Sequence, residues 1–160
     1  MSHPLLRLGG TTWQELVRGL ATRGGGIKES GAFLLGRMVD GLRDARAVVP
    51  YDTLSPEALQ ENFVQLDAAA FAKLWHRCDE TGLEVVADVH THRFAPTQSR
   101  SDRSNPMVAL PGHVAIILPN FARGVTSARD IGLHQYLGSH RWVSWFKKDA
   151  ADRVEICRGQ

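Results

Sequence analysis

The sequence predicts an α/β (α+β) protein with a mixed central β-sheet of about six strands, flanked by two or three helices. Two segments, 11–24 and 68–81, have apolar residues at helical spacing and end at or just before glycine. Short apolar runs separated by turn residues recur through the rest of the chain. The runs at 83–92 and 112–120 are apolar at consecutive positions, which is typical of strands buried on both faces of a sheet.

The first helix is expected over 11–24, with Thr11 or Thr12 as its N-cap. Glu15 follows Thr12 by three residues, the spacing of a capping box. Four residues form the apolar stripe of this helix: Trp13, Leu16, Val17 and Leu20. The run Gly24 to Gly26 ends the helix, because glycine readily adopts the left-handed conformation that follows a helix.

A second helix is expected over 68–81, with Asp67 as its N-cap and Gly82 just past its end. The segment before this helix is ambiguous. Its residues 55–57, Ser-Pro-Glu, suit the start of a helix, whereas residues 62–66 could form a strand.

The remaining apolar runs predict strands. They lie at 30–39, 45–51, 83–92, 112–120, on either side of Gly138 within 131–148, and at 153–158. Asp40-Gly41 between the first two is a typical turn pair, so these two strands are expected to form a hairpin.

Composition places the chain among ordinary globular proteins, and residues 1–160 are expected to form a single domain. The net charge of +2 is too small to indicate nucleic acid or an anionic membrane as the main partner. No run approaches the ~20 apolar residues of a membrane span, and the N-terminus lacks the apolar run of a signal peptide. The two cysteines, Cys78 and Cys157, are far apart in sequence, which argues against a disulfide scaffold and favours a cytoplasmic location.

The segment 85–102, VVADVHTHRFAPTQSRSD, contains the candidate metal ligands. Because side chains alternate along a strand, His90 and His92 point the same way, with Cα atoms roughly 6.5–7 Å apart. Asp102 can return a carboxylate as third ligand after a loop turned by Pro96. Two histidines and one carboxylate, with a fourth position open to water, are the ligands of a catalytic zinc site. Ligand type alone leaves Fe²⁺ and Mn²⁺ open.

Two further positions complete a recognisable pattern. Glu29 stands at the start of the first long apolar strand in the sequence ESGAFLLG, and Ser99 precedes Asp102 by three residues, about one helical turn. The combination E-x-G-x-x-x-x-G, then H-x-H, then S-x-x-D resembles the JAMM (MPN-plus) metallopeptidase family, in particular its prokaryotic members. The later segments GHVAIILPN and GLHQYLGSHRWVSWF are similar to the C-terminal part of bacterial members, so the resemblance spans nearly the whole chain.

The resemblance implies a cytidine-deaminase-like MPN fold and a role for each matching residue. His90, His92 and Asp102 would bind one Zn²⁺ per chain. Glu29 would hydrogen-bond the water on the zinc, take its proton and pass it to the leaving amine, while Ser99 would position that water and stabilise the oxyanion. A carboxylate within hydrogen-bond reach is a suitable base, and a hydroxyl can stabilise developing negative charge.

The substrate class also comes from the resemblance. It implies hydrolysis of the amide bond after the C-terminal glycine of a ubiquitin-like protein, with that protein or its conjugate as the partner. Some prokaryotic relatives belong to antiphage-defence operons with activating and conjugating enzymes, which are possible further partners here. A peptidase for a sulfur carrier or a small peptide conjugate is one alternative, and a non-catalytic MPN scaffold that binds proteins is another.

The chain departs from the family pattern in one loop. Arg93 replaces the proline that usually follows the second histidine, and the span to Ser99 is one residue shorter than usual. Arg93 or Arg100 could contact a substrate backbone or carboxylate, although exposed arginines more often face solvent. His113 could support the site or serve packing, and His134 has no expected catalytic role.

Overall fold

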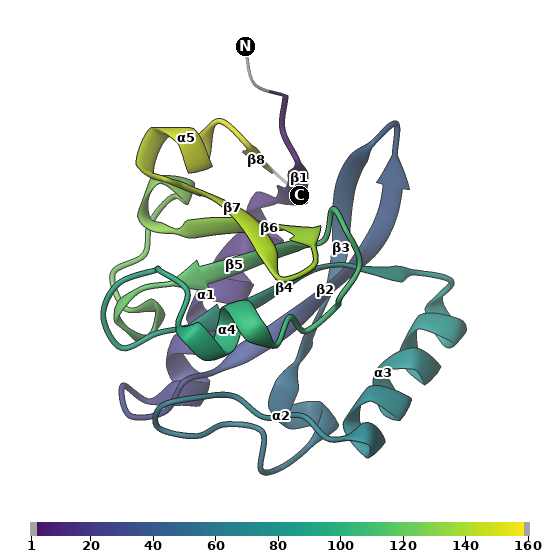
Figure 1. Ribbon diagram of the computed structural model, residues 1–160, viewed down its shortest axis with the longest axis vertical. Coiled ribbons are helices and arrows are strands. Elements are labelled where there is room, and N and C mark those ends of the chain that lie inside the picture. Colours follow the sequence, from purple (N-terminus) through teal and green to yellow (C-terminus); the bar gives the residue numbers. More distant parts are fainter. Residues whose placement is uncertain (1–2, 159–160) are drawn as a thin grey trace.

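The computed structural model describes residues 3–158, in which eight strands form one curled mixed β-sheet (Figure 1). The strands are β1 (Leu6–Gly9), β2 (Gly31–Val39), β3 (Leu42–Pro50), β4 (Glu84–Thr91), β5 (Val114–Leu118), β6 (Gly132–Gly138), β7 (Arg141–Phe146) and β8 (Val154–Cys157). Their order across the sheet is β7-β6-β5-β4-β2-β3-β1-β8. The α+β class is confirmed, but the expected count of about six strands is too low.

Five α-helices accompany the sheet within residues 3–158, rather than the two or three expected. They are α1 (Gly10–Gly24), α2 (Tyr51–Leu54), α3 (Ala68–Thr81), α4 (Arg100–Ser104) and α5 (Lys147–Ala151). Only α1 and α3 are longer than five residues, and short helices of this kind leave little periodic signal in a sequence. No helix among the described residues is long and apolar enough to cross a membrane.

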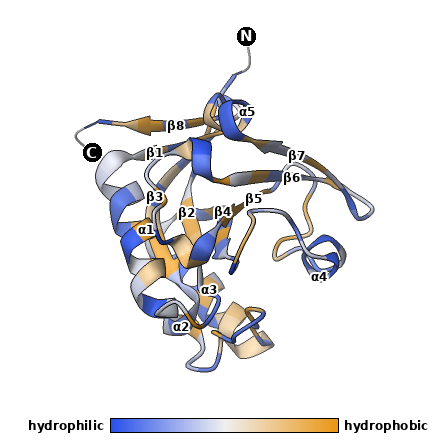
Figure 2. Ribbon diagram, turned by 90° about the vertical axis from the view of Figure 1, so that its left-hand side faces the viewer, coloured by the Kyte–Doolittle hydropathy of each residue, from blue (hydrophilic) through white to orange (hydrophobic). Residues whose placement is uncertain are grey.

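The sheet is covered on both faces. One core joins the apolar stripe of α1 to residues such as Leu34 and Ile116 on one face of the sheet. The other core joins α2 and α3 to Phe33 and Leu35 on the opposite face. Figure 2 shows α1 and α4 on opposite sides of the sheet. The second face therefore carries both α3 and the short helix that follows the H-x-H segment.

The first helix begins earlier than predicted. It starts at Gly10 with Gly9 as N-cap and no side-chain cap, so the expected capping by Thr11 or Thr12 is wrong. The reason is the unexpected strand β1, which pairs in parallel with β3 at Leu6 and Arg7 and with β8 up to Gly9, and leads directly into the helix. A four-residue strand stabilised by distant segments of the chain gives no pattern of its own.

The hairpin of β2 and β3 is confirmed. Asp40 and Gly41 both have positive φ angles, 50° and 81°, as a tight hairpin turn requires. β3 nevertheless ends at Pro50, and Tyr51 begins α2 instead of closing the strand as expected.

The ambiguous segment adopts neither predicted form. No helix starts at residues 55–57, because Ser55 ends α2 in an extended conformation. Residues 62–66 do not form a strand either, since the only pairing there is an isolated bridge between Leu59 and Val64. The segment instead forms a loop that folds back on itself before α3, where the Gln60 amide donates to the Phe63 carbonyl and the Gln65 amide to the Ala58 carbonyl.

Helix α3 matches its predicted bounds. Asp67 accepts a hydrogen bond from the Ala70 amide at 2.8 Å, and Gly82 ends the helix with a φ of 67°. The capping residues at both ends were therefore readable from the sequence.

Candidate metal centre

The two histidines lie on the same face of the sheet, His90 within β4 and His92 directly after its last residue. The Nε2 atoms of His90 and His92 lie 3.0 Å apart, and the ring centroids are separated by 4.8 Å. Thr91 points to the other face, where its hydroxyl accepts a hydrogen bond from the Ser30 amide at 2.9 Å. The alternation of side chains along the strand thus produces the arrangement that the H-x-H spacing predicted.

Asp102 comes to these imidazoles from α4. Its Oδ1 lies 3.4 Å from His90 Nε2, and its Oδ2 lies 3.1 Å from His92 Nε2. Ligand atoms at 2.0–2.1 Å from a tetrahedral zinc ion are roughly 3.3 Å apart. The two distances to Asp102 involve different carboxylate oxygens, but one ligand atom from each of the three residues lies within 4.8 Å of the other two, so together they could hold a metal ion.

A reciprocal pair of hydrogen bonds fixes Asp102. The Ser99 hydroxyl accepts from the Asp102 amide at 3.0 Å, and the Ser99 amide donates to Asp102 Oδ2 at 2.9 Å. This is a capping box at the start of α4. Ser99 therefore orients the carboxylate through its backbone and its side chain, and its hydroxyl proton is still available to donate elsewhere.

The electrostatics of the three groups are coupled. Burial opposes ionisation of Asp102, but hydrogen bonds from His90, His92 and the Ser99 amide outweigh it and hold its pKa well below the usual range. Burial likewise disfavours the charged form of His90, yet contact with Asp102 raises its pKa overall. Cation binding at this point would displace the proton shared by these groups, which links metal affinity to pH.

Glu29 approaches the site from the segment before β2. Its Oε1 lies 4.0 Å from His92 Nε2. Glu29 is therefore next to the group of His90, His92 and Asp102 but is not part of it. The carboxylate is buried at 8 % exposure, and burial raises its pKa, partly offset by His92 and His90. A carboxyl group whose pKa is raised binds a proton more readily than an ordinary one, which suits a general base beside a metal site.

The backbone holds Glu29 firmly. Its amide donates to the Gln60 carbonyl at 2.7 Å, and the hydroxyl of Ser30 donates to the Leu20 carbonyl at 2.7 Å. The next residue, Gly31, lies against the Tyr51 ring and the Val89 carbonyl, where no side chain would fit. The glycine in the ESG sequence is therefore needed for close packing.

The centre opens into a cavity of about 1080 Å³ on the α3 and α4 side of the sheet. Glu29, His90, His92, Ser99 and Asp102 all line it. The loop at 62–66 forms another wall. The five residues of the predicted site are thus brought together around one space.

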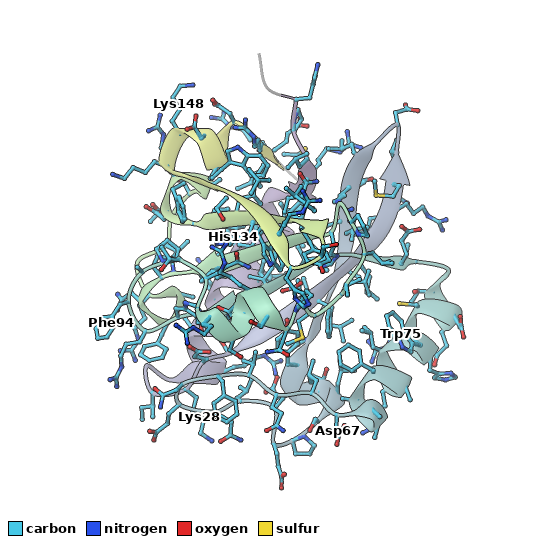
Figure 3. All side chains as sticks on the ribbon, in the orientation of Figure 1. Lys28, Asp67, Trp75, Phe94, His134 and Lys148 are labelled. Atoms are coloured by element: carbon cyan, nitrogen blue, oxygen red, sulfur yellow. The ribbon has the colours of Figure 1, made fainter. Side chains whose placement is uncertain are left out.

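The two arginines have different positions. Arg93 is exposed at the cavity, and its guanidinium lies 5.8 Å from the Phe94 ring and 5.9 Å from the Phe121 ring. Phe94 projects from the periphery of the fold (Figure 3). Arg100 is exposed at the first position of α4 and is not part of the cavity wall. Of the two, Arg93 is the one placed to contact a ligand.

Two further histidines, His113 and His134, are buried and make hydrogen bonds that the sequence did not predict. His134 lies near the middle of the fold (Figure 3) and bonds to the Pro96 carbonyl through Nε2 at 3.0 Å and to Ser144 through Nδ1 at 2.7 Å. Burial lowers its pKa to about 4. His113 bonds to Asp88 at 2.7 Å, with both side chains buried. The sequence could have indicated that Asp88 lies near the site. Asp88 stands two residues before His90 on the same strand, so the two side chains point to the same face.

Comparison with known proteins supports the fold. No family model matches the chain. The structure is similar to the solution structure of a Desulfitobacterium hafniense protein, with a TM-score of 0.70 and 13% identity over 96% of this chain and 93% of the other. It is also similar to a Salinibacter ruber protein, with a TM-score of 0.60 and 17% identity over 96% and 92% of the two chains. At these identities the likeness concerns the fold alone.

Proposed function

We propose that this chain is a zinc-dependent peptidase or isopeptidase of the JAMM (MPN-plus) type. The observation that carries the proposal is the spacing of 3.0, 3.4 and 3.1 Å among the donor atoms of His90, His92 and Asp102. Glu29 stands beside this set without joining it. The sequence pattern that motivated the resemblance thus corresponds to one compact site.

His90, His92 and Asp102 would hold the ion, and imidazole with carboxylate suits Zn²⁺ well. When bound, a zinc ion supplies Lewis acidity that polarises a carbonyl and makes a water molecule more acidic. The remaining chemistry falls to side chains of this chain. Glu29 accepts the proton of the attacking water and delivers it to the leaving amine, which its raised pKa favours.

Ser99 serves the reaction in two ways. Its oxygen accepts the Asp102 amide and so orients a ligand, while its proton can be donated into the cavity that it lines. A hydroxyl that donates there stabilises the negative charge that develops on the carbonyl oxygen. The oxyanion role proposed from the sequence is compatible with the capping role.

The substrate we propose is the amide after the C-terminal glycine of a ubiquitin-like protein, either as precursor or as conjugate, in a bacterial conjugation or antiphage-defence system. An extended tail needs a groove with free backbone groups beside the catalytic centre. The loop at 62–66 borders the cavity, and in the described part of the chain its backbone hydrogen bonds to other backbone groups involve only the Phe63 carbonyl and the Gln65 amide. It therefore offers backbone groups for such a tail.

The test uses a ubiquitin-like protein that ends in glycine, fused to a short C-terminal extension, with and without a chelator. We expect cleavage that zinc restores, about one zinc per chain, and complete loss of cleavage with retained zinc in Glu29→Gln. His90→Ala and Asp102→Ala should lower zinc occupancy. Turnover that persists in Glu29→Gln would remove Glu29 from the base role, and a chain that cannot be loaded with zinc would refute the metal site.

A further inference from the structure

Asp88 contributes an additional carboxylate to the cavity of the metal centre. It lies two residues before His90 on the same face of β4, and its side chain is only 4% exposed, yet it lines the cavity. A buried carboxylate costs free energy unless hydrogen bonds or opposite charge compensate it. The groups that contact this carboxylate therefore indicate the role of Asp88.

One half of the carboxylate is held rigidly. Its Oδ2 bonds to His113 Nε2 at 2.7 Å. The backbone of His113 is fixed in turn, because its amide donates to Leu110 and its carbonyl accepts from Tyr136. Among residues 3–158, none donates a hydrogen bond to the other oxygen, Oδ1. Asp88 is thus pre-oriented and retains one acceptor for a ligand in the cavity.

The neighbours of Asp88 across the sheet are apolar, namely Phe33 on β2 and Ala115 on β5, while His90 is its polar neighbour on the same face of β4. The Phe71 ring lies 6.0 Å from the Phe33 ring, and Phe71 and Met107 line the same cavity as Asp88. An alkyl chain that ends in a cation can pack against such apolar side chains while its charged end meets the carboxylate.

We propose that Asp88, supported by His113 and sharing its cavity with Phe71, forms a subsite for a basic side chain, an alkylammonium or alkylguanidinium, of the substrate. The inference rests on the proposed function and narrows its substrate class to amides with a basic side chain close to the scissile bond. Asp88 and His90 are two residues apart, so their Cα atoms are separated by roughly 6.5–7 Å along the strand. An extended lysine side chain spans a similar length.

The test compares two zinc-binding probes that differ only in the terminal ammonium, Nα-acetyl-lysine hydroxamate and Nα-acetyl-norleucine hydroxamate. On the zinc-loaded protein, the lysine probe should bind about tenfold more tightly, as a charge-assisted hydrogen bond gives. Asp88→Asn should remove this preference, so that the lysine and norleucine probes bind the variant with equal affinity. Asp149→Asn, the same change at an exposed position on α5, should retain it.

Equal affinities of the wild-type protein for the two probes would overturn the subsite, as would a lysine preference that survives in Asp88→Asn. Binding of the norleucine probe by Asp88→Asn shows that the variant is folded and holds zinc. The wild-type comparison stands even if the variant does not fold.

Failure of both hydroxamates to bind would contradict the metal centre and thus the proposed function. The subsite is then judged without metal, from the NMR signals of the His113 imidazole during titration with the amides of the same two amino acids. A shift with Nα-acetyl-lysine amide alone supports the subsite, and no shift with either amide overturns it.

Discussion

Ser99→Ala separates the capping role of Ser99 from a general loss of stability. The substitution removes the 3.0 Å bond from the Asp102 amide to the hydroxyl but leaves the 2.9 Å bond from the Ser99 amide to Asp102 Oδ2. Loss of an N-cap costs about 1 kcal/mol of folding free energy. Loss of a group that orients a metal ligand lowers metal affinity by about 10- to 100-fold. Because the bond from the Ser99 amide remains, we expect the zinc affinity of Ser99→Ala to fall by about tenfold, the lower end of this range.

A second capping box offers a matched control. Ser127 accepts from the Arg129 amide at 3.2 Å, and its own amide donates to Asp130 at 3.2 Å, in a 3₁₀ turn that does not border the cavity. Ser127→Ala should cost a similar free energy of unfolding and leave zinc affinity unchanged. Ser99→Thr retains a hydroxyl cap and should recover most of the zinc affinity.

The assay is competition for zinc with a fluorescent chelator, paired with urea denaturation of each zinc-free variant. The expected result is similar destabilisation by the two alanine substitutions and a zinc affinity that falls only in Ser99→Ala. Equal zinc affinities for Ser99→Ala and Ser127→Ala would refute the claim that the cap orients Asp102.

Two further predictions concern stability. Burial holds the pKa of His134 at about 4 against 6.5 in the unfolded chain, so the unfolded state binds the additional proton and stability falls as pH drops from about 6.5 to 4. The loss of stability approaches about 3 kcal/mol. In urea denaturation at several pH values, the free energy of unfolding of His134→Gln should depend less on pH than that of the wild-type protein, and the same dependence in both would contradict this role of His134. Gly31→Ala should cost about 1–3 kcal/mol, because its Cβ would overlap the Tyr51 ring. Gly19→Ala in α1, where nothing lies within 4 Å, should instead stabilise by about 0.5–1 kcal/mol in the same denaturation assay; destabilisation of equal size in both variants would argue against the packing explanation.

The parts of the fold that could be predicted from the sequence are those specified by neighbouring residues. Helix α3 has its cap Asp67 and its terminating Gly82 within the segment itself, and the β2–β3 hairpin has its turn between the strands. Strand β1 lacks such a local specification, since it pairs with β3 and β8 at distant points of the chain. Its formation depends on tertiary contacts that no short window contains.

The same distinction applies to the site. The common direction of His90 and His92 follows from alternation along one strand, and the relation of Ser99 to Asp102 follows from one helical turn. The approach of Glu29 was expected only from the resemblance, because its distance from His92 depends on the pairing of β2 with β4. Pairing between strands determines which of many carboxylates reaches the centre.

The loop after His92 shows how long-range contacts replace a local restraint. In the family that the sequence resembles, a proline usually follows the second histidine and limits the backbone there. Here Arg93 imposes no such limit, but three backbone carbonyls of the loop form hydrogen bonds with residues further along the chain. The Phe121 amide donates to His92 at 2.8 Å, the Asn120 amide donates to Phe94 at 3.1 Å, and His134 bonds to Pro96 at 3.0 Å.

This restraint has a cost in the segment that provides it. Asn120, Phe121 and Ala122 all have positive φ angles, 52°, 54° and 66°. Non-glycine residues in this conformation each cost roughly 1–2 kcal/mol, and asparagine tolerates it best. The strain is maintained because Phe121 and Ala122 are buried, so the turn keeps its amides directed at the loop. The position of His92 in the ligand set therefore depends on packing some thirty residues further along the chain as well as on the H-x-H motif itself.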